Sequence, residues 1–110
     1  MSLEYKREIV YSDDQCDVVL CTWPPGAKSL CHDHGEATGI IRVIEGSLYQ
    51  DIYSKETKEF IRKDIFQKDE IFIETPELIH IMGNGSDTKE ATTLHMYTPK
   101  LKINNYDIGR

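Results

Sequence analysis

Seven short segments with β-strand character follow one another along this chain of 110 residues, and they constrain its fold more than any other feature. Apolar and polar residues alternate in most of them, as in half-buried strands. Turn-forming residues separate the segments, and almost no helical periodicity is present. Many short strands at near-regular spacing predict an antiparallel sandwich or barrel. The predicted strands cover residues 17–23, 39–46, 47–53, 59–66, 70–75, 78–84 and 91–97.

The domain organisation is simple. The length of 110 residues is that of one domain with one core, and there is no internal repeat, low-complexity tract or linker. We therefore expect a single domain over residues 1–110. Its barrel should cover about residues 5–99, and residues 100–110 should form an irregular tail over one sheet.

Composition excludes several functional classes. The net charge is −6, and the basic residues are scattered rather than clustered, which argues against a nucleic-acid partner. No run of about 18 apolar residues is present, so we expect no membrane span. The N-terminal segment lacks the apolar core of a signal peptide, which predicts a cytoplasmic protein. Cys16, Cys21 and Cys31 form no C-x-x-C motif, and in that compartment we expect them to be reduced.

The four histidines occur in only three segments of the chain. His32 and His34 are two residues apart, so in a strand both side chains lie on one face, about 6.6 Å apart at the backbone. His80 lies on a later predicted strand between apolar neighbours. Three imidazoles from two strands can bind a metal ion and leave coordination positions open. The alternative for an isolated H-x-H pair is an ordinary surface or hydrogen-bonded role.

The residues around these histidines resemble the cupin superfamily, in which a small β-barrel supplies metal ligands from two motifs. Gly26 precedes His32 by six residues, and Gly46 closes the β-rich run after His34. Gly39 occupies the position at which the cupin motif usually has a glutamate. The resemblance therefore implies an all-β, double-stranded β-helix (jelly-roll) fold with three histidine ligands and no carboxylate.

Longer segments resemble the cysteine dioxygenase type I family of thiol dioxygenases. The stretch CTWPPGAKSLCHDHGEATGIIRVIEGSL (21–48) is similar to the family's tryptophan, glycine turn, H-D-H motif and following hairpin. The segment TTLHMYTP (92–99) is similar to its [ST]-x-H-x-Y-[ST]-P motif, and YKREIVY (5–11) to its Tyr-x-Arg strand. The resemblance covers most of residues 5–99 in the order of the family.

This resemblance implies that His32, His34 and His80 bind Fe(II), and that O2 oxidises L-cysteine to cysteine sulfinic acid. Three neutral ligands would leave the ion its full charge, which favours binding of a thiol as the thiolate. Arg7 would bind the substrate carboxylate, since its guanidinium is a planar and permanently charged donor. Tyr5 would lie nearby, and Trp23 would line the pocket.

The resemblance also assigns a second group of residues. Tyr97 would stand beside the substrate and O2 and donate a hydrogen bond to developing charge, with His95 bonded to it and Thr93 behind. Alternation independently places these three side chains on one strand face. Gly39 excludes the cysteine that some members cross-link to the tyrosine, so Tyr97 should be unmodified. Thr98-Pro99 stands where the family tends to have a turn that can be cis.

The sequence is also compatible with other functions. A related enzyme could act on 3-mercaptopropionate or another small thiol, although such relatives tend to have glutamine at the position of Arg7. A non-catalytic cupin, as a sensor or structural module, could hold Zn or Ni at the same site, and three histidines also suit zinc hydration chemistry. Family members usually have a helical segment ahead of the barrel, so the pocket here could be more open or covered by a partner subunit. Cupins often pair through edge strands, which allows a homodimer.

Overall fold

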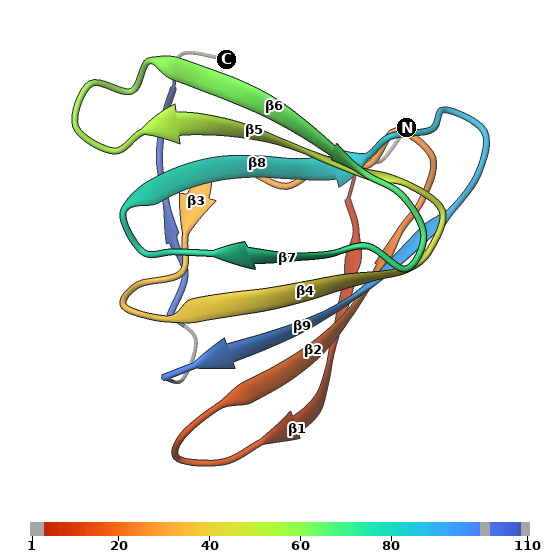
Figure 1. Cartoon of the computed structure of the whole chain (residues 1–110), viewed down its shortest axis with the longest axis horizontal. Coiled ribbons are helices and arrows are strands. Elements are labelled where there is room, and N and C mark those ends of the chain that lie inside the picture. Colours follow the sequence, from red (N-terminus) through yellow and green to blue (C-terminus); the bar gives the residue numbers. More distant parts are fainter. Residues whose placement is uncertain (1–3, 100–101, 109–110) are drawn as a thin grey trace.

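The computed structural model describes residues 4–99 and 102–108, and in these ranges all regular structure is β-strand (Figure 1). None of these residues lies in a helix that could cross a membrane. The strands, in chain order, are β1 (Lys6–Ser12), β2 (Asp17–Trp23), β3 (His32–Asp33), β4 (Thr38–Glu45), β5 (Leu48–Ser54), β6 (Phe60–Phe66), β7 (Ile71–Glu74), β8 (Leu78–Asn84), β9 (Ala91–Thr98) and β10 (Asn104–Asn105).

The strands form two five-stranded sheets with antiparallel pairing throughout. The first sheet has the order β1-β2-β9-β4-β7, and the second has the order β10-β3-β8-β5-β6. Neighbours in both sheets are mostly distant in sequence, as Figure 1 shows for β9 between β2 and β4. Such crossing connections are typical of a jelly roll rather than of a simple meander. The expected all-β architecture is confirmed.

The core lies between the two sheets because alternate residues of each strand face inward. In β2 the buried and half-buried positions alternate over all seven residues, as period-two patterning requires. Val19 and Ile41 from the first sheet meet Leu48 and Met82 from the second in one buried cluster. Each such side chain contributes about 1.5–3 kcal/mol when it is fully removed from water.

The seven predicted strands are all present, with each end within one residue of its predicted position. The strand at Lys6–Ser12 agrees with the segment that resembled the family's Tyr-x-Arg strand. Two strands were not predicted, β3 and β10, and each has only two residues. Strands of this length are too short for an alternating pattern to be visible in the sequence.

The C-terminal segment was expected to be an irregular tail over residues 100–110. Residues 100, 101, 109 and 110 lie outside the described ranges, and the remaining part includes β10, which pairs with β3. Asp33 provides the reason: its carboxylate accepts hydrogen bonds from Asn104 and Tyr106 and pairs with Lys55 at 3.0 Å.

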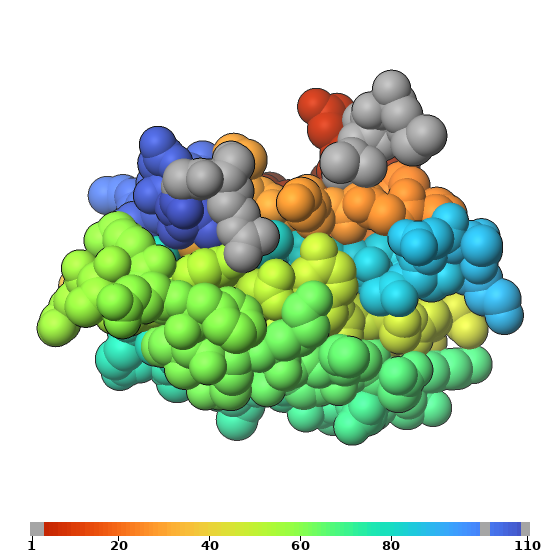
Figure 2. Space-filling view, turned by 90° about the horizontal axis from the view of Figure 1, so that it is seen from above, coloured from red at the N-terminus to blue at the C-terminus, as the bar shows by residue number. Residues whose placement is uncertain are grey.

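In Figure 2 this segment and the first described residues rise on either side of a depression in the surface. The Thr98–Pro99 peptide bond is cis.

Candidate metal centre

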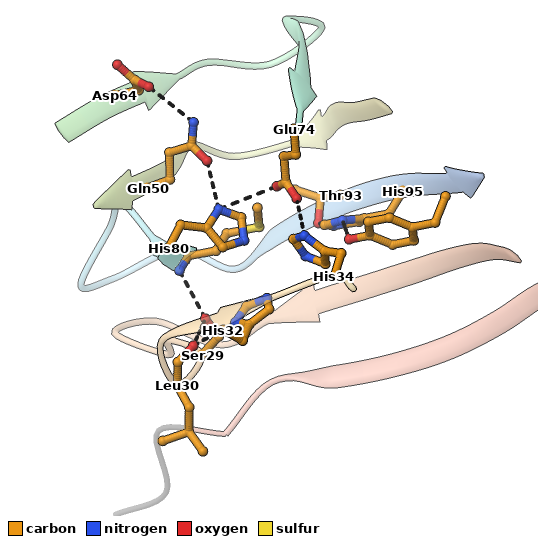
Figure 3. A network of polar contacts seen from close by, with 12 residues as sticks. Ser29, Leu30, His32, His34, Gln50, Asp64, Glu74, His80, Thr93 and His95 are labelled. Carbon is orange, nitrogen blue, oxygen red and sulfur yellow. Dashed lines mark hydrogen bonds and ion pairs between the residues drawn. The ribbon is translucent and has the colours of Figure 1, made fainter. Parts of the chain in front are cut away.

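Three of the four histidines converge between the sheets (Figure 3). His32 in β3 lies directly across from His80 in β8, and His34 is the first residue after β3. All three are buried, with 5–7% of each residue exposed. One ring nitrogen from each lies within 4.8 Å of those of the other two, and the ring centroids are 4.7–5.0 Å apart. Within residues 4–99 and 102–108, these three histidines are the one cluster of potential ligand side chains placed closely enough to hold a metal ion.

The outer nitrogen of each ring has an acceptor beside it. Nδ1 of His32 lies 2.7 Å from the carbonyl oxygen of Leu30, and Nδ1 of His80 lies 2.9 Å from Oε1 of Gln50. Both acceptors lack protons, so each Nδ1 carries the hydrogen and donates it, which leaves Nε2 as the atom with a free lone pair.

The inner nitrogens fit a metal ion. Nε2 of His80 is buried and has no hydrogen-bond partner in the described part of the chain. A buried polar atom without a partner costs about 1–3 kcal/mol, and a cation would satisfy it. Three converging imidazoles, two of them with their outer nitrogens fixed by hydrogen bonds, form a suitable donor set for a first-row divalent ion.

Burial keeps these imidazoles neutral. It lowers the pKa of His32, lowers that of His34 to about 3, and lowers that of His80 well below its usual value. Proximity of the rings to one another adds to the shift for His34 and His80. Neutral rings are the form that binds metals, so the site does not have to lose protons near neutral pH.

Glu74 in β7 also contacts the histidine group, although it is not among the site residues predicted from the sequence. Its carboxylate is buried, lying 3.1 Å from Nδ1 of His34 and 3.6 Å from Nδ1 of His80. Burial raises the pKa of this carboxyl well above its usual range. The histidine set has no carboxylate among its converging atoms, but one lies directly behind it. Alternation from Phe72, which faces the core, was the signal that could have found it.

A chain of hydrogen bonds runs along the inner face of β9. Nε1 of Trp23 donates to Oγ1 of Thr93 over 2.9 Å, and the same hydroxyl lies 2.6 Å from Nε2 of His95. Nδ1 of His95 lies 2.8 Å from the hydroxyl of Tyr97, whose ring stacks on His34 at 4.9 Å. All four residues are buried. The chain connects the pocket wall to a phenol beside the histidine group.

This environment also fixes the charge states along the chain. Burial lowers the pKa of His95 to about 3 and raises the pKa of Tyr97 well above its usual value. His95 is therefore a neutral ring at neutral pH, and Tyr97 is a protonated phenol. A neutral histidine has one donor and one acceptor nitrogen, so it can pass a hydrogen bond from Thr93 through to Tyr97.

Arg7 and Tyr5 reach the same region from the N-terminal strand. Together with Tyr97, His32 and His34 they line a cavity of about 20 Å³. The Tyr5 ring stacks on Trp23 with centroids 4.1 Å apart. A cavity of this size holds about one water molecule, so the closed arrangement has no room for an amino acid.

A second cavity, of about 180 Å³, approaches the histidines from the opposite side. Glu74, Gln50 and Arg62 line it, together with His34 and His80. Since Glu74 and Gln50 contact the Nδ1 atoms, this cavity borders the outer side of the two rings. The guanidinium of Arg62 is already paired with Asp64 at 3.1 Å.

Sequence comparison decides the family. A family model described as cysteine dioxygenase type I matches residues 3–108, nearly the whole chain. The chain belongs to the cysteine dioxygenase type I family. Cysteine dioxygenase type 1 from Bos taurus is 26% identical over 102 residues, covering 86% of this chain and 51% of that protein. The chain thus spans about half the length of the curated relatives it matches, and the predicted family resemblance is confirmed.

Solved structures show the same fold at low sequence identity. A Klebsiella pneumoniae protein with a double-stranded β-helix domain superposes with a TM-score of 0.79 at 17% identity, over 94% of this chain and 85% of that one. The cupin domain of Schizosaccharomyces pombe Cnp3 gives a TM-score of 0.73 at 10% identity, over 86% and 61%. These comparisons confirm the cupin fold of this cysteine dioxygenase family member.

Proposed function

We propose that this chain is a non-haem Fe(II) thiol dioxygenase that oxidises L-cysteine to cysteine sulfinic acid. The overall reaction joins one thiol and one O2, and both oxygen atoms end on sulfur, so no other oxidant or reductant is needed. The observation that carries the proposal is the contact between the histidine group and a phenol, with Tyr97 stacked on His34 at 4.9 Å. A passive metal site has no need of a buried phenol and its hydrogen-bond chain.

His32, His34 and His80 would hold the iron. Ferrous iron would supply open coordination positions at which thiol and O2 can be activated together. The protein's contribution is to hold the three rings in place before the ion arrives. Nδ1 of His32 and Nδ1 of His80 already have hydrogen-bond acceptors at 2.7 and 2.9 Å, so these two rings need little reorganisation on binding.

Tyr97 would donate a hydrogen bond to charge that develops near sulfur and oxygen. The indole of Trp23 can only donate, so the hydroxyl of Thr93 has its own proton to give to Nε2 of His95. The ring proton of His95 then lies on Nδ1 and is donated to the oxygen of Tyr97. In this arrangement the phenol proton is free to point into the site. A donor fixed in this way acts without reorganisation during the reaction.

Arg7 would bind the carboxylate of the substrate, and Tyr5 would close the pocket above Trp23. Because the cavity is only about 20 Å³, the substrate must displace these side chains as it enters. β1 is suited to this movement because it is an edge strand that pairs only with β2 among the described strands, and all its residues are exposed.

A non-catalytic metal-binding cupin is the second candidate, and the small size of this cavity is the observation that favours it. The histidine group alone suits zinc or nickel as well as iron. The expected homodimer also stays a prediction.

Oxygen uptake tests the proposal. Protein loaded anaerobically with Fe(II) would be mixed with L-cysteine, 3-mercaptopropionate or cysteamine, and O2 consumption compared with sulfinic acid formed. We expect one O2 per thiol and the highest kcat/KM with L-cysteine. Uptake with none of the three thiols, in protein that has bound iron, would support the non-catalytic candidate.

The variant Arg7→Gln tests whether Arg7 binds the carboxylate of the substrate, as distinct from taking part in oxidation of the thiol. Loss of a charged hydrogen bond costs about 1.5–3 kcal/mol, so kcat/KM for L-cysteine should fall about 10- to 150-fold. Cysteamine has no carboxylate, and its kcat/KM should change little. An equal fall with both thiols would mean that Arg7 does not bind a carboxylate.

A further inference from the structure

Glu74 is a buried carboxylate that the fold does not explain. Only 7% of the residue is exposed, and neither carboxylate oxygen has a hydrogen bond of standard geometry in the described part of the chain. The cation that lines the neighbouring cavity, Arg62, is paired with Asp64 instead. Burying the ionised form of this carboxyl without a compensating charge costs several kcal/mol, which is why burial raises its pKa, and an apolar residue such as Phe72 would avoid that cost.

The sheet register directs this side chain at the histidines. β7 pairs with β4 and β4 with β9, so that Gly39 lies directly between Glu74 and Tyr97. A Cβ atom at position 39 would lie 2.8 Å from the ring of Tyr97. With no side chain at position 39, the carboxylate and the phenol approach the histidine group from either side.

The three outer acceptors differ in charge. His32 has a backbone carbonyl beside Nδ1, and His80 has the neutral amide of Gln50. His34 has a carboxylate. When a cation in the site favours its ionised form, a carboxylate at this distance makes the imidazole a better donor to the metal ion than a neutral acceptor does. Of the three proposed ligands, His34 is therefore the one whose binding to a metal ion a neighbouring carboxylate would strengthen.

We propose that Glu74 is a positioning residue of the metal centre, which holds Nε2 of His34 inward and supplies one negative charge beside the bound divalent cation. The inference rests on the proposed metal site and deepens it. The donor atoms at the centre would all be neutral. Burial favours the protonated form of Glu74 in the metal-free site, whereas a divalent cation nearby favours the carboxylate, so in the metal-bound site the surroundings would carry charge −1. An ion in the site would therefore exert less than its full double-positive charge on a thiol, contrary to the expectation from three neutral ligands alone.

Metal affinity, measured without any thiol or O2, tests this role. Co(II) is a suitable probe because its visible absorption reports occupancy, and a competing chelator extends the range of measurable Kd. Glu74→Gln keeps an acceptor oxygen but removes the charge, and outer-sphere changes of this kind cost about 10- to 100-fold in affinity. Glu36→Gln is the matched control, since it removes one carboxylate from an exposed position near His34. We expect the control Kd to stay within twofold of the unaltered protein.

Two further measurements keep the test decisive. Thermal melting of the metal-free proteins should show Glu74→Gln at least as stable as the unaltered chain, with a smaller rise on adding Co(II). In Zn(II)-loaded unaltered protein, nitrogen NMR of the histidine rings should show His34 bound through Nε2 with its proton on Nδ1. Binding through Nδ1 would overturn the proposal without any variant.

The outcomes also separate this inference from the proposed function. If the unaltered protein binds neither Co(II) nor Fe(II), the metal site itself is wrong. If it binds them and Glu74→Gln binds Co(II) equally well, only the role of Glu74 is wrong.

Discussion

His32 and His80 are direct partners in the antiparallel register of β3 and β8. Two proposed ligands far apart in sequence are thus joined by the pairing of a two-residue strand with a seven-residue one. A slip of one residue in this pairing would turn either ring to the other face of the sheet. The proposed metal centre therefore depends on the register of this sheet as much as on the identity of its ligands.

Metal binding should stabilise the fold through these rings. At a free Co(II) concentration of about 100 times Kd, linkage adds about 2.7 kcal/mol, which corresponds to a rise in Tm of about 11 °C. His80→Ala should abolish this rise. His95→Gln, which alters a buried histidine outside the group, should retain it. Scanning calorimetry with and without Co(II) measures both, and loss of the rise in His95→Gln would contradict the proposed ligand set.

Tyr97→Phe should separate catalysis from metal binding. The change removes the phenol hydroxyl but keeps the ring stacked on His34. Loss of one preorganised donor to developing charge typically lowers kcat about 10²-fold or more. Steady-state O2 uptake should show this fall with the Co(II) affinity unchanged. A kcat within threefold of that of the unaltered protein would mean that the hydroxyl has no part in the proposed reaction.

Gly39→Ala should disturb Tyr97 directly. The added methyl would lie 2.8 Å from Cε1 of a buried aromatic ring, so the ring or the sheet must shift. Overpacking of this kind costs about 1–3 kcal/mol, which urea unfolding can measure. Gly85→Ala is the matched control because its methyl would meet only the side-chain hydroxyl of Ser47, which can rotate away. Equal losses of stability in the two variants would contradict the steric explanation.

Cys21 should make the fold sensitive to alkaline pH. Burial raises the pKa of its thiol from 9.0 to about 11, and the guanidinium of Arg7 only partly offsets this. Below about pH 9 the thiol is protonated in both the folded and the unfolded chain. Between pH 9 and 11 the unfolded chain loses this proton and the folded one does not, so the free energy of unfolding falls as pH rises.

The size of this alkaline effect can be isolated with a variant. A shift of two pKa units corresponds to at most about 2.7 kcal/mol. Urea unfolding at pH 8 and at pH 11 should therefore show a larger loss for the unaltered protein than for Cys21→Ala. Tyr5 and Tyr97, whose pKa values burial also raises, contribute in both proteins, and their contribution is smaller in Cys21→Ala because the charge of Cys21 adds to both shifts. Identical losses would show that the thiol is not the group responsible.

The sequence predicts the strands well because their alternation directly reflects the two faces of each sheet. Val19 and Ile41 face the core as period-two patterning requires. The same rule places Thr93, His95 and Tyr97 on one face, and the structure adds the hydrogen bonds that link them. These inferences need only local geometry.

Features that depend on packing between distant strands could not be predicted in the same way. A glutamate near a turn is usually solvent-exposed, so Glu74 gave no sign of burial beyond its alternation with Phe72. The acceptors at the Nδ1 atoms come from Leu30, Gln50 and Glu74, on three different segments. The volume of the cavity beside Arg7 depends on how Tyr5 stacks on Trp23, which no single segment determines.

Asp33 lies between two proposed ligands in sequence and is held from the other side by Tyr106 and Asn104. The C-terminal segment thus fixes the position of the loop that carries His32 and His34. Substitutions at Tyr106 should change the rate at which a bound ion exchanges with solution, because they would loosen the loop without altering any ligand. Metal lability in this barrel could be adjusted by engineering a residue more than seventy positions from the nearest ligand of that loop.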